Sequence, residues 1–227
     1  MLHTCSTHAP QKCSNAPHML HTCFTHAPHM LHNAPHMLHN SAPMIHTSAP
    51  VCQNGLDAMT YLVDRMGGDF RPYLQTVLPP IIDRLGDSKD MVRNKAQLLL
   101  MKILERDVVT AQQLFDKLAP AFSHKNGRIR EEVLTTLVTT INEHGIQSLL
   151  VSRLIPCIVK SLSDPMSTVR DAAFNTLVDI YRHVGERLRH DLTKKHQVPP
   201  SKLPALLARF DEIREEGGLL PSALSGD

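Results

Sequence analysis

Apolar residues recur at three- and four-residue intervals along the chain from about residue 56 onward, the spacing of helices with one buried face. The first such stretch covers residues 56–70 and meets a helix stop signal at Gly67-Gly68. Three pairs of helices are then predicted, each joined by a short polar turn, at about residues 74–103, 114–141 and 150–180. A final helix is expected from about Lys202 to Glu216, where it would cap the array.

The second helix of each pair opens with the same dipeptide type, a branched residue followed by arginine. These dipeptides are Val92-Arg93, Ile129-Arg130 and Val169-Arg170, and their arginines lie 37 and 40 residues apart. Two-helix HEAT-type repeats have a period of roughly 40–47 residues. The sequence therefore predicts an all-α fold, an α-solenoid of HEAT-type helical pairs. In such an array each pair contacts its neighbours, and equivalent turns line up on one edge.

Composition divides the chain near Asn54. Residues 1–53 hold ten of the fifteen histidines and four of the five cysteines, but one aromatic residue and no acidic one. Such a stretch buries little apolar surface, and its six prolines would interrupt any helix. We therefore expect a His/Pro/Met-rich, disordered low-complexity tract at 1–53, a folded array at 54–218 and a disordered tail at 219–227.

The amino-terminal tract also raises the question of a metal site. Cys5 with His8, and Cys23 with His26, lie three residues apart and could contribute zinc ligands. A structural zinc site needs four ligands held by a folded unit, and this tract offers interchangeable ligands without a core. Low complexity is the favoured interpretation, and no metal or other cofactor is expected.

Charge becomes informative only through its distribution, because residues 54–227 hold 23 Lys and Arg against 22 Asp and Glu. The predicted turns concentrate cations on one edge: Lys89 in the first, Lys125, Arg128 and Arg130 with Asn126 in the second, and Arg170 in the third. These side chains would form a basic ridge that meets an acidic protein surface. Arg93 and Arg130 are expected to be structural, pairing with an acidic residue of the adjacent repeat, while Arg170 could serve either role.

Other classes of function find little support. No apolar run is long enough to span a membrane, and no basic-then-apolar signal opens the chain, so an intracellular protein is expected. The run from Arg187 to His196 fits a basic helix end better than a nucleic-acid site. No nucleophile-and-base motif or phosphate-binding loop occurs, so no enzymatic activity is expected. Cys157 is expected to be a small buried residue.

Three stretches resemble the first TOG domain of the CLIP-associating proteins (the CLASP family): Val77 through Asp87, His124-Lys125-Asn126-Gly127-Arg128, and Asp171-Ala172-Ala173 through Ile180 to Arg187. The similarity covers roughly residues 56–216. It implies a monomeric module that holds tubulin and microtubules through its turns, and that stabilises or promotes the growth of dynamic microtubules at their plus ends. Its expected location is the cytoplasm and its microtubules, with the spindle and the kinetochore as candidate sites. The tubulin-binding residues that the resemblance implies are Lys89, Lys125, Asn126, Arg128 and Arg170.

The chain also departs from that family. The opening helical pair and the first helix of the second pair are missing, and the chain has no Trp to match the aromatic residue that the first TOG turn commonly presents. The further TOG domains, the basic serine-rich linker and the CLIP-binding domain are absent. The helix at 56–66 would then expose an apolar stripe, and reduced stability and weakened tubulin binding are expected. Alternatives are a HEAT-repeat scaffold of another class, an enzyme, and a non-functional gene fragment.

Overall fold

The computed structural model describes residues 48–224, which belong to one unit of the chain. Within that range the structure is helical and contains no strand, and no helix is long and apolar enough to cross a membrane. The elements are α2 (Ala49–Met66), η1 (Gly67–Tyr73), α3 (Leu74–Leu85), α4 (Asp90–Glu105), α5 (Ala111–Leu118), η2 (Ala119–Ser123), α6 (Gly127–His144), η3 (Ile146–Ser148), α7 (Val151–Ser161), α8 (Ser167–Val184), α9 (Glu186–Lys194), α10 (Leu203–Glu215) and α11 (Pro221–Leu224).

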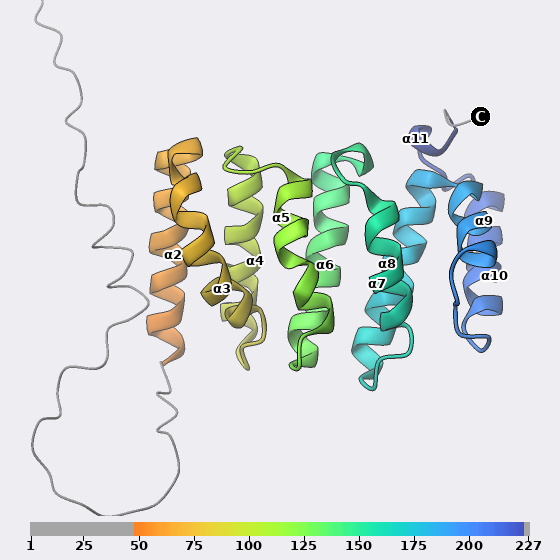
Figure 1. Cartoon of the computed structure of the whole chain (residues 1–227), viewed down its shortest axis with the longest axis horizontal. Coiled ribbons are helices and arrows are strands. Elements are labelled where there is room, and N and C mark those ends of the chain that lie inside the picture. Colours follow the sequence, from red (N-terminus) through yellow and green to blue (C-terminus); the bar gives the residue numbers. More distant parts are fainter. Residues whose placement is uncertain (1–47, 225–227) are drawn as a thin grey trace, which may run out of the picture. The chain divides into compact units, whose positions relative to one another are not determined.

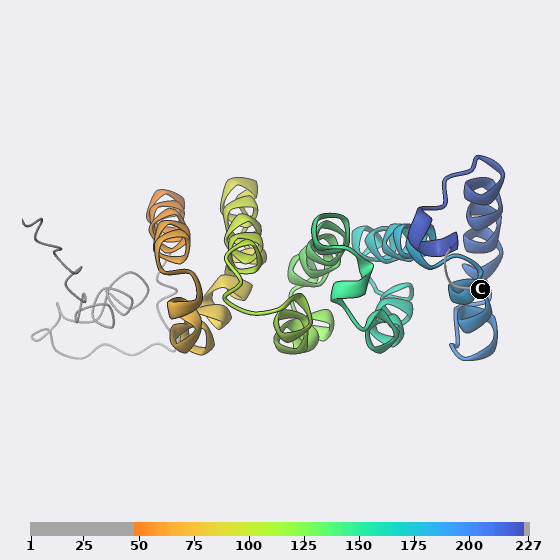
Figure 2. The ribbon, with the colours of Figure 1, turned by 90° about the horizontal axis from the view of Figure 1, so that it is seen from above.

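The helices stand side by side in two layers (Figures 1 and 2). Helices α3, α5 and α7 form one layer, and α2, α4, α6 and α8 form the other. Each helix of the first layer leads through a short turn into its partner in the second, giving the pairs α3–α4, α5–α6 and α7–α8. The predicted solenoid of helical pairs is confirmed.

The core lies between the layers and consists of the periodic apolar positions. Val92, Ala96, Leu99 and Ile103 of α4 are completely buried. The corresponding stripe of α8, from Val169 through Ala173 and Leu177 to Ile180, is buried in the same way. The three- and four-residue spacing therefore identified the faces that pack between the layers.

Helix α2 begins earlier than predicted, at Ala49, ahead of the expected boundary at residue 54. Pro50 occupies the first turn, where its fixed φ and missing N–H are compatible with a helix, so this proline does not interrupt it. The other prolines of the 1–53 tract, and the candidate metal ligands Cys5, His8, Cys23 and His26, lie outside the described residues.

The expected exposure of the apolar stripe of α2 is wrong. Leu56, Met59 and Val63 are buried, because α2 packs closely against α4. Ion pairs between the two helices add to this contact, including those of Asp57 with Lys95 and of Asp64 with Arg106. The large apolar side chains that α2 does expose are Val51 and Tyr61.

Three local features depart from regular helical pairs with a closed core. Pro120 converts the end of the first helix of the second pair into the short 3₁₀ helix η2. Pro165 lies in the turn ahead of α8, which begins at Ser167. Cys157, expected to be buried, is half-buried and not part of the closed core.

The carboxy-terminal helices close the end of the array, as predicted for a cap. Phe210 of α10 stacks on Tyr181 of α8 with ring centroids 4.0 Å apart, and both side chains are fully buried. The chain then returns to α8, where the Leu220 amide donates to the Arg182 carbonyl oxygen over 2.8 Å. Helix α11 packs on α8, so the prediction of a disordered tail is wrong for residues 219–224.

Candidate functional site: the turn edge

The turns of the three pairs lie on one edge, at the bottom of Figure 1. We call this surface the turn edge and define it as residues 86–90, 123–128 and 163–167. Helices α4, α6 and α8 all begin there. Because the amino-terminal end of a helix carries a partial positive charge, the backbone itself favours an anionic partner at this edge.

The second residue of each turn builds the turn in the same way. The side chains of Asp87, His124 and Asp164 each accept a hydrogen bond from the backbone N–H two residues later, at 2.9, 3.1 and 2.9 Å. In the second turn this acceptor is the His124 Nδ1, so that nitrogen carries no proton in this arrangement. The three turns are thus local structures of one type, which the sequence specifies at equivalent positions.

The recurrent arginines stabilise these turns through hydrogen bonds to backbone carbonyl oxygens. Each guanidinium donates to the carbonyl oxygen six residues earlier: Arg93 to Asp87 at 2.9 Å, Arg130 to His124 at 2.5 Å and Arg170 to Asp164 at 2.8 Å. Recurrence at one repeat position therefore reflects a shared contact that shapes the turn.

Two of these arginines also join adjacent repeats. Arg93 Nε donates to a Glu132 carboxylate oxygen of the next pair over 3.0 Å. Arg130 makes two bonds to the Asp164 carboxylate, at 2.7 and 2.8 Å, with both side chains nearly buried. The prediction that Arg93 and Arg130 are structural and pair with an acidic residue of the adjacent repeat is confirmed.

The two carboxylates of these pairs respond differently to their surroundings. Burial raises the pKa of Glu132, and the Arg93 guanidinium only partly offsets that effect. At Asp164, the hydrogen bonds from Arg130 outweigh burial and lower the pKa, and the Met166 amide adds to the effect. The Arg130–Asp164 pair is therefore the better compensated link along the turn edge.

Close packing between turns uses two glycines. A Cβ atom on Gly86 would lie 2.4 Å from Asn126 Nδ2 and 2.7 Å from Ile129 Cγ1. A Cβ atom on Gly127 would lie 1.8 Å from the sulfur of Met166. Asn126 and Met166, the residues just before α6 and α8, thus each pack on a glycine of the preceding turn. These two contacts fix the spacing of the three turns.

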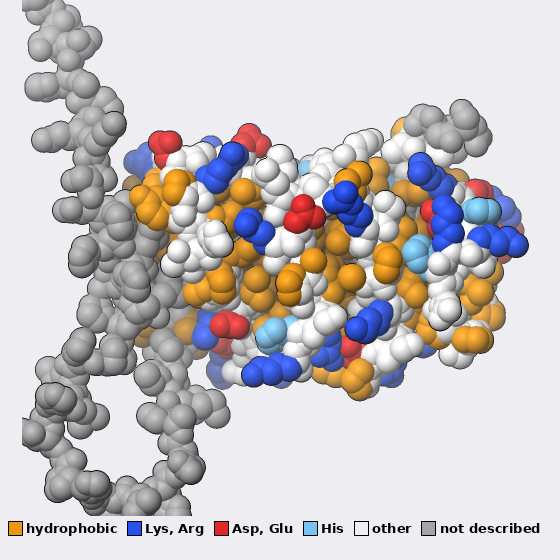
Figure 3. Space-filling model, in the orientation of Figure 1, with side chains coloured by type: hydrophobic (Ala, Val, Ile, Leu, Met, Phe, Trp, Pro, Cys, Tyr) orange, Lys and Arg blue, Asp and Glu red, His pale blue; other side chains and the backbone are white. Residues whose placement is uncertain are grey.

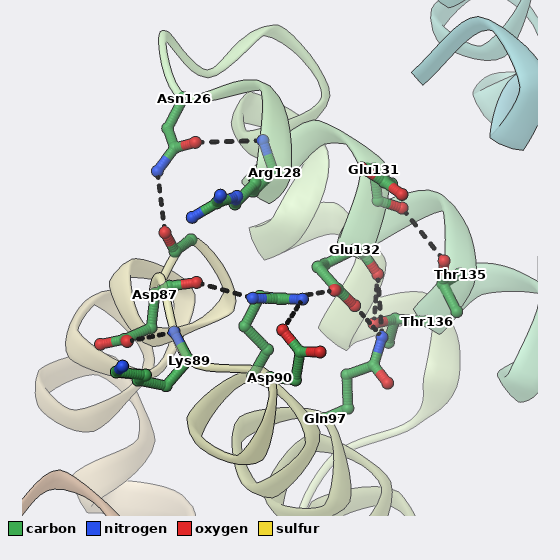
Figure 4. A network of polar contacts seen from close by, with 12 residues as sticks. Asp87, Lys89, Asp90, Gln97, Asn126, Arg128, Glu131, Glu132, Thr135 and Thr136 are labelled. Atoms are coloured by element: carbon green, nitrogen blue, oxygen red, sulfur yellow. Dashed lines mark hydrogen bonds and ion pairs between the residues drawn. The ribbon is translucent and has the colours of Figure 1, made fainter. Parts of the chain in front are cut away.

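Asn126 has both polar ends of its side chain engaged inside the protein. Its Oδ1 accepts from the Arg128 N–H over 3.0 Å, and its Nδ2 donates to the Gly86 carbonyl oxygen over 3.1 Å (Figure 4). It therefore caps the start of α6 and bridges the first two turns. Among the candidate residues, it is the one that holds the edge in shape.

Three candidate cations remain free to meet a partner. Lys89, Lys125 and Arg128 are exposed, and within residues 48–224 their side chains make no hydrogen bond or ion pair. Figure 3 shows Lys and Arg side chains along the lower edge of the molecule, where these turns lie. Acidic residues are present too, but Asp164 is paired with Arg130, and Asp90, although exposed, is paired with Arg93.

Arg170 occupies an intermediate position. It fastens its own turn, donating to the carbonyl oxygens of Asp164 and Pro165 at 2.8 and 2.9 Å. Unlike Arg93 and Arg130, it forms no ion pair with another repeat in the described part of the chain. Part of its guanidinium is thus available to a ligand.

Several residues of this site are identified by the structure and not by the predicted turns. His124 and Asp164 both lie six residues before a recurrent arginine, and that register is a signal that the sequence does contain. Met166 covers Gly127, and Lys160 lies beside the third turn; neither position follows a pattern that the sequence displays.

The basic run from Arg187 to His196 forms helix α9 and the residues after it. Leu188 and Leu192 are buried, and Arg189 lies over the rings of Tyr181 and Phe210 while pairing with Asp211 at 2.6 Å. Part of this run therefore belongs to the carboxy-terminal cap.

Among the described residues, no group of three or more His, Cys, Asp or Glu side chains is arranged to hold a metal ion.

Stacked helical pairs with equivalent turns on one edge define a HEAT-type domain of the TOG class. Solved structures support this class. The chain matches the N-terminal domain of MAST/Orbit with a TM-score of 0.73 and 48% identity, over 74% of this chain and 75% of that one. It shares its fold with a TOG domain of C. elegans Zyg9, with a TM-score of 0.64 and 20% identity over 74% of this chain and 63% of that one.

Sequence relatives identify the family. The family profile described as CLASP N terminal matches residues 13–201, and the chain belongs to this family. The match begins within the tract that composition alone assigned to low complexity. The chain is 51% identical over 175 residues to the CLIP-associating protein of Drosophila melanogaster, and 47% identical over 169 residues to CLIP-associating protein 1-A of Xenopus laevis. These alignments cover 77% and 74% of this chain but only 12% and 11% of the two relatives, so the chain spans about an eighth of their length.

Proposed function

We propose that this chain is a tubulin- and microtubule-binding module of a CLASP-type regulator, and that it binds through the turn edge. The observation that carries the proposal is the set of three unpaired cations, Lys89, Lys125 and Arg128, on turns whose spacing is fixed by internal contacts. The starts of α4, α6 and α8 add positive potential at the same edge. An acidic protein surface is the complementary partner.

The relatives support tubulin as that partner. CLIP-associating proteins share about half of their aligned residues with this chain. Among the structures that share the fold alone, one is described by TOG–tubulin binding specificity and its promotion of microtubule dynamics. We extend these associations to this chain, and with them a location on cytoplasmic microtubules, including those of the spindle.

The candidate residues divide by role. Lys89, Lys125 and Arg128 contact tubulin, Asn126 positions the second turn, and Arg170 both fastens the third turn and offers the rest of its guanidinium. The action is positional and not catalytic: a module that holds tubulin near a microtubule end favours growth or stabilises the lattice without covalent chemistry. A single module has none of the avidity that several linked modules supply.

Binding of the full chain to purified tubulin dimers and to microtubules tests this proposal. The turn-edge variant replaces three residues by Glu: Lys89, Lys125 and Arg128. The matched control also introduces three Glu residues, in place of the exposed cations Lys117, Arg153 and Arg187 on α5, α7 and α9. Both variants change net charge equally. The turn-edge variant is expected to bind at least about tenfold more weakly than the parent, and the control close to the parent.

The salt dependence adds a second criterion. Parent binding is expected to weaken as ionic strength rises, because exposed charges are screened over about 10 Å at 0.1 M salt. Equal losses in both triple variants would mean that net charge and not the turn edge governs binding. Undiminished binding by the turn-edge variant would favour a HEAT scaffold that uses another surface, and a folded parent that binds neither form of tubulin would reject the proposal.

A further inference from the structure

A pocket of about 400 Å³ opens beside the turn edge, between the second and third turns. Its walls come from η2, the end of α7 and the following turn, with Arg130 of α6 behind them. The polar side chains that line it are Ser123, Arg130, Lys160, Ser161, Ser163 and Asp164. None of the residues proposed above as direct tubulin contacts lies among them.

The charges inside this pocket do not cancel. Asp164 receives two bonds from Arg130 and one from the Met166 N–H, so both carboxylate oxygens have a partner and the ion pair is neutral as a unit. Lys160 is exposed, and within residues 48–224 its ammonium group has no hydrogen bond or ion pair. One uncompensated positive charge therefore remains in the pocket.

Two hydroxyl groups accompany this charge. The side chains of Ser123 and Ser163 also lack a hydrogen-bond partner within the described residues, whereas Ser161 donates to the Cys157 carbonyl oxygen over 3.0 Å. An ammonium group and two hydroxyl groups supply the donors that a carboxylate, which only accepts hydrogen bonds when ionised, requires. The Phe122 side chain lines the pocket as well and excludes water from part of its wall.

The pocket is also continuous with the turn edge. Arg130, which lines the pocket, donates to the Lys125 carbonyl oxygen over 3.3 Å, so Lys125 and the pocket share a rigid support. A protein surface that contacts Lys125 therefore lies beside the pocket.

We propose that this pocket receives one Glu or Asp side chain of the acidic surface that binds the turn edge, with Lys160 as its ionic partner. This assignment rests on the proposed function and extends the binding surface from the turns onto the α3–α5–α7 layer. It gives the bound partner a fixed position along the edge, which exposed charges alone do not provide.

The test compares Lys160→Ala and Lys160→Arg in the full chain, with tubulin dimers as the probe. The matched control is Arg153→Ala, because Arg153 is an exposed cation on the same helix, seven residues earlier and thus on the same face. Lys160→Ala is expected to raise the Kd roughly three- to tenfold. Lys160→Arg is expected to restore most of the affinity, and Arg153→Ala to leave it unchanged.

Carbodiimide cross-linking supplies an independent readout, because it joins an amine to a carboxylate that touches it. We expect mass spectrometry to find Lys160 joined to a tubulin Glu or Asp, and exposed Lys117 of α5 not joined. Parent binding with no effect of Lys160→Ala and no such cross-link would overturn this inference alone. Failure of the folded parent to bind tubulin would overturn the proposed function as well.

Discussion

Removal of the Asp164 carboxylate is expected to destabilise the protein more than removal of any exposed acid on the turn edge. Asp164 joins the second and third turns through its two bonds to Arg130, and it also accepts the Met166 N–H. Its side chain is 8% exposed and that of Arg130 is 13% exposed, so solvent replaces little of what is lost. Asp164→Ala therefore leaves a nearly buried guanidinium without its counter-charge.

The expected loss is about 3–4 kcal/mol. Removing one partner of a buried ion pair typically costs about 3–5 kcal/mol, and loss of the turn contact adds roughly 1 kcal/mol, but the adjoining pocket admits water to Arg130 and reduces the total. For a chain of this size each kcal/mol lowers the melting temperature by about 2–4 °C, which gives a decrease of roughly 10 °C. Asp90→Ala is the matched control: Asp90 pairs with Arg93, but its side chain is 82% exposed, so we expect a loss below about 1 kcal/mol.

Circular dichroism during thermal and urea unfolding measures both variants. The pH dependence supplies a further check, because the Arg130 hydrogen bonds hold the pKa of Asp164 below its ordinary value. A lowered folded-state pKa means that the stabilisation is present above the unfolded pKa of about 3.9 and is lost as pH falls through the folded pKa. The gap between parent and Asp164→Ala should thus close in acid. Equal losses in Asp164→Ala and Asp90→Ala at neutral pH would show that burial of the Arg130–Asp164 pair does not set its contribution to stability.

Four further substitutions probe how the turns and the cap are held, each measured by urea unfolding. Gly86→Ala is expected to lower the free energy of unfolding by about 1–3 kcal/mol, because the buried Ile129 side chain cannot move away from the new methyl group. Gly127→Ala is expected to lower it by less than about 1 kcal/mol, because the exposed Met166 side chain can move. Equal losses would contradict this difference. Asn126→Ala should cost about 1–2 kcal/mol through loss of the helix cap and the bridge to the first turn, and a neutral effect would contradict the bridging role. Phe210→Ala should cost about 3–5 kcal/mol by opening the carboxy-terminal cap, and a loss below 1 would show that α10 is not part of the core.

The helical pairs were predictable because their buried faces repeat at helical spacing and because arginine recurs at one repeat position. The sequence also indicated why Arg93 and Arg130 recur, since a structural contact repeats with the fold. The start of α2 was not predictable from composition. Pro50 argued against a helix at residues 49–53, although these residues form the first turn of α2. Helix α11 was missed because four residues carry too little periodicity to register, and its position depends on contacts with α8.

The candidate site was predictable in outline but not in its division of roles. Lys89, Lys125, Asn126 and Arg128 could all be placed on one edge from the turn positions. The engagement of both ends of Asn126 depends on the distance between two turns, and no single-chain pattern encodes that distance. Lys160 was missed for the same reason, because its pocket forms only where η2 and α7 meet.

Hydrogen–deuterium exchange of the full chain, with and without tubulin, locates the binding surface, because it reports backbone protection segment by segment. Binding through the turn edge would slow exchange in residues 86–90, 123–128 and 163–167 when tubulin is bound. It would leave exchange unchanged in residues 106–110 and 144–150, which connect the pairs at the opposite edge. Protection at those connecting loops, with none in the turns, would contradict the assignment of the turn edge as the binding surface.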